Sequence, residues 1–274
     1  MNMAIPEASG TPERLPPRLL FLAASVPAGT PGKSDRPPHR TSHETALNTL
    51  KTGLGIFLSP EFRKTGTVSD SISTRIPDPA PGKLPEILAA PSGKPYFRDP
   101  ALPFFSWAHS GPLVFLGIAD VPLGTDAEIV ASGRNLRGIS ERFFSEKEQR
   151  YLNEDSAAFP ERFFELWTLR EAAGKYEGSG IQGFRNIEID PESRRTTING
   201  TPLTAWSGSI AFRNRVWYLG AALAASDSEN TVPELSPPLI FLPPENPEQN
   251  PPEPPRISWN VWTRQSRGCS CLAD

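Results

Sequence analysis

Two carboxylates separated by one residue are the first candidates for chemistry in this chain. Asp126 and Glu128 stand in the run GTDAE at residues 124–128. Residues i and i+2 of a β-strand point to the same face, so on a strand the two carboxylates project together. Hard divalent cations prefer oxygen ligands of this kind. On spacing alone, the solvated face of an edge strand explains the pair better, because acidic residues with one spacer are common.

A second chemical pair lies on a predicted helix. Apolar residues recur at helical spacing over residues 163–169 and predict a buried stripe. Glu171 and Lys175, four residues apart, share one face of that helix. A surface ion pair would explain them, at a few tenths of a kcal/mol. Gly174 argues mildly for close packing or a ligand, because glycine inside a helix costs about 1 kcal/mol relative to alanine.

Two further positions carry groups that can bind anions. His109 lies just after an apolar strand predicted over 104–107, and Lys94 lies in the rigid turn Gly93-Lys94-Pro95. A lone histidine at such a place is usually structural, and one lysine in a turn says little by itself. Neither residue is decisive alone.

The elements that must position these groups follow from periodicity and from Pro and Gly punctuation. A buried strand is favoured over a secretory signal for residues 19–26, because the apolar run is short and ends at Pro27. No element is predicted for residues 59–92. The other predicted elements are helices over 43–58, 139–152 and 163–177, and strands over 104–107, 113–119, 123–129 and 217–226.

Composition limits the classes of function. The 274 residues are 37% hydrophobic and include 32 prolines, more than twice the average share of about 5%. The net charge of −3 argues against broad nucleic-acid binding, and no apolar run approaches the ~20 residues that span a membrane. Residues 227–256 are too proline-rich to form a core and are expected to be extended or disordered. Cys269 and Cys271 are too few for a disulfide framework, which fits a cytoplasmic protein.

Taken in order, six segments resemble the 4'-phosphopantetheinyl transferase superfamily, and look closest to its longer class, which primes peptide and polyketide synthetases. The family pattern runs GKP, a strand ending SHS, GxDxE, RFFSxxE, WxxKExxxK and GxG. The corresponding segments here are Gly93-Lys94-Pro95, Ala108-His109-Ser110, Gly124 to Glu128, Arg142 to Glu148, Trp167 to Lys175 and Gly178-Ser179-Gly180. No single segment is specific, but six in order and spacing are. The resemblance covers about residues 93–225.

The resemblance implies an α/β (α+β) fold of two similar subdomains in a pseudo-twofold arrangement, with the site between them. It implies that magnesium is held by Asp126, Glu128 and Glu171. It further implies that coenzyme A is contacted by Lys94, Pro95, His109, Ser110, Arg170 and Lys175, with Glu171 and Lys175 as the catalytic pair. Glu148 and Trp167 look structural. The domains expected are a loose N-terminus at 1–18, a divergent subdomain at 19–92, a transferase core at 93–225 and a proline-rich tail at 226–274.

Two departures from the family pattern bear on function. The residue before the third metal ligand is usually lysine, whereas this chain has Arg170, which keeps the charge but not the shape. Basic residues early in the family hold the nucleotide 3'-phosphate. Arg36, Arg40 and Lys51 are candidates here, but no motif fixes their register.

The activity implied is transfer of the 4'-phosphopantetheine arm of coenzyme A to a serine of an apo acyl or peptidyl carrier protein. Magnesium is the cofactor expected, and 3',5'-ADP the leaving group. A monomer is expected, with no nucleic-acid or membrane partner. Two alternatives stay open: an inactive relative that binds carrier protein or coenzyme A without transfer, and a proline-rich scaffold protein.

Overall fold

The computed structural model describes residues 17–26, 39–65, 83–131, 133–212, 214–225, 239–242 and 256–262. Arg36, Cys269, Cys271 and most of the proline-rich segment lie outside these ranges. The elements are β1 (Leu19–Ser25), α1 (His39–Phe57), α2 (Pro60–Thr65), β2 (Ile87–Ala89), β3 (Pro95–Phe97), β4 (Phe104–Ser110), β5 (Leu113–Ala119), β6 (Leu123–Ile129), α4 (Leu136–Phe143), α5 (Glu146–Asn153), α6 (Phe159–Glu177), the 3-10 helix η1 (Gly180–Asn186), β7 (Ile187–Asp190), β8 (Arg195–Ile198), β9 (Thr201–Phe212), β10 (Arg215–Ala224), β11 (Leu239–Leu242) and β12 (Arg256–Trp262).

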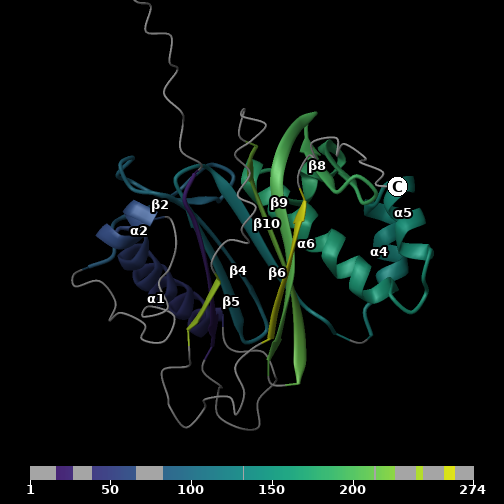
Figure 1. The fold of residues 1–274 in the computed structure, drawn as a ribbon, viewed down its shortest axis with the longest axis horizontal. Helices are drawn as coiled ribbons and strands as arrows, with labels where there is room; N and C mark the ends of the chain where they lie inside the picture. Colours follow the sequence, from purple (N-terminus) through teal and green to yellow (C-terminus); the bar gives the residue numbers. More distant parts are fainter. Residues whose placement is uncertain are drawn as a thin grey trace, which may run out of the picture.

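The first sheet has the strand order β11-β1-β5-β4. β1, which the sequence predicts, is buried along its whole length and pairs antiparallel with β5, so that Phe21 lies opposite Gly117. β11 pairs with β1 in parallel. Helix α1 packs against β1 and β5, and Leu22, Leu50 and Ile118 belong to the same apolar core. In Figure 1, α1 and α2 lie on one side of the strands and α4, α5 and α6 on the other.

Helix α2 lies in a segment for which the sequence indicates no element. The Ser59 side chain accepts a hydrogen bond from the backbone N–H of Phe62 at 3.2 Å and so begins the helix. Phe62 is fully buried, with its ring centroid 5.2 Å from that of Phe57. Periodicity does not detect so short a helix, because it contributes a single residue to the core.

The second sheet runs β6-β10-β9-β8-β7, with β12 as an additional partner of β9. β6 has the bounds that the sequence predicts, whereas β7, β8 and β9 were not anticipated. β4 of the first sheet packs against β6 of the second. The Ser106 hydroxyl on β4 accepts a hydrogen bond from the backbone N–H of Thr125 on β6 at 3.0 Å, which joins the two sheets.

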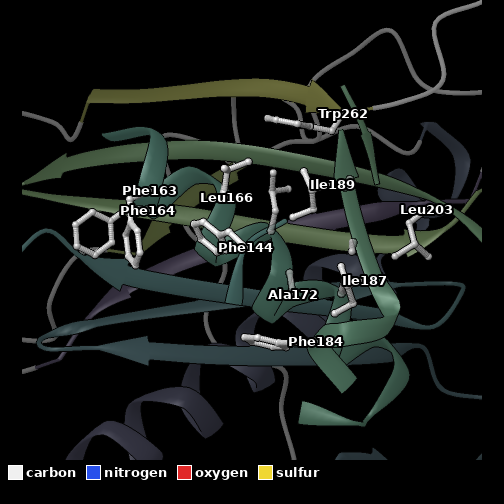
Figure 2. Packing of buried hydrophobic residues seen from close by; sticks show 14 of the residues in the cluster. Phe144, Phe163, Phe164, Leu166, Ala172, Phe184, Ile187, Ile189, Leu203 and Trp262 are labelled. Atoms are coloured by element: carbon white, nitrogen blue, oxygen red, sulfur yellow. The ribbon is translucent and has the colours of Figure 1, made fainter. Parts of the chain in front are cut away.

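The single helix predicted over residues 139–152 is two helices, α4 and α5. Phe144 and Ser145 adopt extended backbone angles between them. Ser145 and Glu148 form a capping box, in which each side chain accepts a hydrogen bond from the other residue's backbone N–H. Helical periodicity continues across this break, because both helices turn apolar residues toward the same core. Figure 2 shows part of that core, with Phe144 and Phe163 among its rings.

The C-terminal segment does more than the sequence indicates. β12 pairs antiparallel with β9, and Trp262 is 2% exposed within the core of Figure 2. The Trp262 indole donates to the Ser207 hydroxyl at 2.8 Å, and Ser207 donates to Glu165 on α6 at 2.7 Å. A region expected to contribute nothing to a core therefore supports the helix that carries Glu171.

The fold is mixed α/β with several antiparallel sheets. The expected pseudo-twofold relation between two subdomains stays a prediction, as do the domain boundaries. Within the described ranges, every helix is too short or too polar to cross a membrane.

Candidate active site between β6 and α6

Two glycines allow α6 to lie directly on the second sheet. A methyl group added at Gly124 on β6 would overlap the backbone carbonyl oxygen of Ala172, and one added at Gly220 on β10 would overlap that of Thr168. The register of the strands places Gly220 opposite Asp126. Any larger residue at either glycine would push the helix away, so Gly124 sets the distance between Asp126 and the helix.

The central contact of the site joins Asp126 and Lys175. The ammonium Nζ of Lys175 donates to Oδ1 of Asp126 at 2.7 Å, where the aspartate side chain is 4% exposed and the lysine side chain 36%. The other oxygen, Oδ2, is buried and accepts no hydrogen bond from the described part of the chain. The lysine therefore compensates only part of the aspartate's charge.

Glu171 lies beside this pair on the same helix. Burial, followed by the neighbouring Asp126 carboxylate, raises the pKa of Glu171 to about 8. When protonated, Glu171 can donate a hydrogen bond to Asp126, whereas two ionised carboxylates there repel each other. At neutral pH, Asp126 and Glu171 together therefore carry less than two negative charges.

Glu128 completes the carboxylate group. Burial and the Asp126 carboxylate raise its pKa, and Arg134, whose Nη1 lies 3.1 Å from Oε2, opposes that rise. The Ser110 hydroxyl donates to the same oxygen at 3.3 Å. Arg134 was missed from the sequence, because it lies in the connection after β6, where no pattern marks it.

The residue types fit a divalent cation, although no group of three is poised for one. Across the described ranges, no three acidic, histidine or cysteine side chains are arranged to hold a metal ion as they stand. At Asp126 the Lys175 ammonium provides the positive charge instead. The buried Oδ2 of Asp126 and the raised pKa values of Glu128 and Glu171 indicate negative charge that a dication would stabilise.

Lys94 reaches the same helix from the turn before β3. Its Nζ donates to the backbone carbonyl of Tyr176 at 2.7 Å and lies 5.8 Å from the centroid of that ring. Burial lowers the pKa of Lys94 to about 8. Pro95, the first residue of β3, is half-buried and pairs with Ala89 on β2. The turn is thus held at the carboxyl end of α6, one residue beyond Lys175.

The end of β4 contributes Ser110 but turns His109 elsewhere. Ser110 is buried, and its hydroxyl also accepts from the backbone N–H of Ile129 at 2.9 Å, while its carbonyl accepts from the Trp217 indole at 2.8 Å. His109 is exposed and, by strand alternation, lies on the opposite face of β4 from Ser110. The structure therefore places Ser110 at the carboxylates and does not bring His109 to them.

Residues 122–217 match the family model of the 4'-phosphopantetheinyl transferase superfamily. That stretch contains the Asp126, Glu128, Glu171 and Lys175 group just described. Over this stretch, the chain is similar to that superfamily.

Curated relatives support the same family over part of the chain. It is 37% identical over 91 residues to a 4'-phosphopantetheinyl transferase of Bacillus pumilus, covering 33% of this chain and 38% of the relative. It is 35% identical over 114 residues to one of Bacillus subtilis, covering 39% and 46%. It is 35% identical over 100 residues to one of Escherichia coli strain K12, covering 35% and 50%. The chain spans half or less of these relatives' lengths.

The position of Arg170 differs from the one that the resemblance implies. The sequence resemblance implies that Arg170 contacts coenzyme A, but its side chain is only 2% exposed and lies in the protein interior. Its guanidinium binds both carboxylate oxygens of Glu148 at 2.5 Å. Because the guanidinium is bound to Glu148 in the interior, the structure does not bring Arg170 to Asp126. Glu148 and Trp167 have the structural positions expected of them.

Proposed function

We propose that this protein transfers the 4'-phosphopantetheine arm of coenzyme A to a serine of an apo acyl or peptidyl carrier protein, as the longer class of the superfamily does. The observation that carries the proposal is the meeting of Asp126, Glu171 and Lys175 in one partly buried group, inside the segment that matches the superfamily. A structural ion pair of Asp126 and Lys175 would not need a second carboxyl, Glu171, whose pKa is raised to about 8.

The reaction divides among these residues as follows. The serine hydroxyl attacks the β-phosphate of coenzyme A, a serine O–P bond forms, the pyrophosphate P–O bond breaks, and 3',5'-ADP leaves with the electron pair. Glu171 in its ionised form takes the serine proton. Lys175 and Lys94 offset the negative charge that develops on the pyrophosphate. Ser110 and Arg134 hold Glu128 in place.

Asp126, Glu128 and Glu171 would hold magnesium, which when bound supplies electrostatic stabilisation of the phosphates. Its binding requires all three carboxyls to be ionised, so Glu171 would release its proton. Residues 93–225 form the transferase core in this proposal. Arg170 does not contact coenzyme A in this proposal, because its side chain is buried. His109 contacts the coenzyme only if the coenzyme extends beyond the carboxylates.

The decisive test is an incubation of the purified full chain with apo carrier proteins, coenzyme A and magnesium, followed by intact mass spectrometry. A mass gain of one phosphopantetheine arm on the carrier is expected. The gain should vanish with a carrier whose acceptor serine is replaced by alanine, and with EDTA. Tight coenzyme A binding without any mass gain on a panel of carriers would overturn the transferase proposal and favour an inactive relative.

A further inference from the structure

Arg170 and Glu148 form a fully buried ion pair that the reaction does not use. Nη2 of Arg170 lies 2.5 Å from both carboxylate oxygens of Glu148, and the two side chains are 2% and 0% exposed. Nη1 donates to the backbone carbonyls of Phe184 and Ile187, each at 2.8 Å. One guanidinium therefore binds three other parts of the chain: α5, the end of η1 and the start of β7.

The partners of this pair are themselves fixed. Oε2 of Glu148 also accepts from the backbone N–H of Ser145 at 2.8 Å, which caps α5. Phe184 packs against Trp167 on α6, with ring centroids 5.6 Å apart. Removing Arg170 would leave the Glu148 carboxylate buried without its counter-charge, which is far more costly than losing an exposed ion pair.

Arg170 immediately precedes Glu171 on α6. On the sheet side, the helix backbone touches Gly124 and Gly220, so it cannot move closer to the strands. These two contacts do not prevent the helix from rotating about its axis, and such a rotation would carry Glu171 away from Asp126. Because the Arg170 guanidinium is bound at three fixed points, rotation of α6 would break buried hydrogen bonds.

We propose that Arg170 and Glu148 are positioning residues, which fix the rotation of α6 and so hold Glu171 and Lys175 over Asp126. This inference rests on the proposed function and assigns the Arg170 charge to the interior of the protein rather than to the coenzyme A phosphates. Lysine is a poor replacement, because one ammonium cannot span a carboxylate and two carbonyls as the planar fork does.

The test compares Arg170→Lys, Arg170→Met, Glu148→Gln and the double variant Arg170→Met/Glu148→Met in the full chain. Glu161→Gln is the matched control, since Glu161 lies on the same helix and is exposed. Three quantities are measured: kcat and KM with carrier protein, the Kd of coenzyme A by calorimetry, and backbone hydrogen exchange over residues 180–187. The double variant, which buries no charge, provides a folded protein if the single variants unfold.

Positioning predicts a kcat at least tenfold lower in the single and double variants, a coenzyme A Kd within about threefold of wild type, and faster exchange over 180–187. Glu161→Gln should change none of these. A Kd for coenzyme A at least tenfold weaker with unchanged exchange would overturn the proposal and make Arg170 a phosphate ligand. Unchanged kcat in the folded double variant would also overturn it. If the wild type transfers nothing, the proposed function fails, while calorimetry of Mn²⁺ binding and hydrogen exchange still decide on positioning: unchanged values in the double variant would overturn it.

Discussion

The ammonium of Lys175 lies 2.7 Å from one oxygen of Asp126, while the other oxygen of Asp126 is buried without a donor among the described residues. This contact joins the middle of β6 to the last turns of α6 across 49 positions of sequence. Lys175 thus contacts the carboxylate that the superfamily resemblance assigns to a metal. Substrate and metal binding would have to rearrange this contact, and several testable consequences depend on it.

Asp126→Asn should lower the transfer rate by about 10²–10³-fold, because the change removes one preorganised electrostatic partner. Excess magnesium or manganese should restore part of the rate. Initial rates against metal concentration provide the measurement. Asp120→Asn is the control, since Asp120 follows the last residue of β5 and pairs with Arg18. This variant should keep the wild-type transfer rate. Equal losses in both variants would show that Asp126 has no special role.

Lys175→Met should separate metal binding from transfer. Without the ammonium at Asp126, Mn²⁺ should bind more tightly in the absence of coenzyme A, because no cation has to be displaced. Transfer should nevertheless be slower and should not recover with added metal, because the phosphates lose a positive charge. Calorimetry with Mn²⁺ and initial rates test the two halves. Lys147→Met, which alters an exposed pair with Asp190, is the control; weaker Mn²⁺ binding in Lys175→Met would contradict the prediction.

Glu171 should make stability depend on pH in metal-free buffer. The pKa of Glu171 is about 8 in the folded chain and near 4.5 in the unfolded chain. Between these values the unfolded chain has released a proton that the folded chain keeps, so the stability that Glu171 contributes is present below pH 4.5 and is lost as pH rises to 8.

Glu171→Gln should therefore match wild type near pH 4.5 and exceed its unfolding free energy by on the order of 2–4 kcal/mol at pH 8.5. Urea titrations at several pH values measure the difference. Glu86→Gln, at a carboxylate that is 58% exposed, should show no such trend. A Glu171→Gln advantage that is independent of pH would mean that Glu171 ionises normally.

Lys94 should limit the use of coenzyme A at alkaline pH. Its pKa of about 8 means that the side chain loses its positive charge above pH 8. The value of kcat/KM for coenzyme A should then fall by up to about tenfold per pH unit. Lys94→Arg should remove this decline, because arginine stays charged. Lys83→Arg, at an exposed lysine, should behave as wild type; an identical profile in Lys94→Arg would assign the decline to another group.

Removal of the segment after residue 225 should destabilise the protein, contrary to what its composition indicates. The truncation deletes Trp262, and Trp262→Ala alone should cost about 3–5 kcal/mol of unfolding free energy. Ile257→Ala, on the same strand but 38% exposed, should change it by less than about 1 kcal/mol. Urea unfolding of the three proteins gives the comparison. A truncated protein as stable as wild type would show that β12 adds nothing.

Local pattern determined the elements that carry the chemistry. The apolar run of β1, the strands β5 and β6, and most of α6 follow from periodicity, because each has one continuous buried face or is buried throughout. The i, i+2 and i, i+4 spacings of the charged residues are properties of a strand and of a helix. They could therefore be read before the two elements were known to touch.

Only the tertiary structure decided which groups meet. Nothing local indicates that Lys175 contacts Asp126, or that Arg170 turns inward to Glu148, because both contacts depend on how α6 lies against its neighbours. The same holds for Trp262, which becomes a core residue only because β9 offers it an edge. Sequence spacing fixes the face of an element on which a side chain lies. The partner on that face, and with it the side chain's burial and pKa, is set by long-range packing.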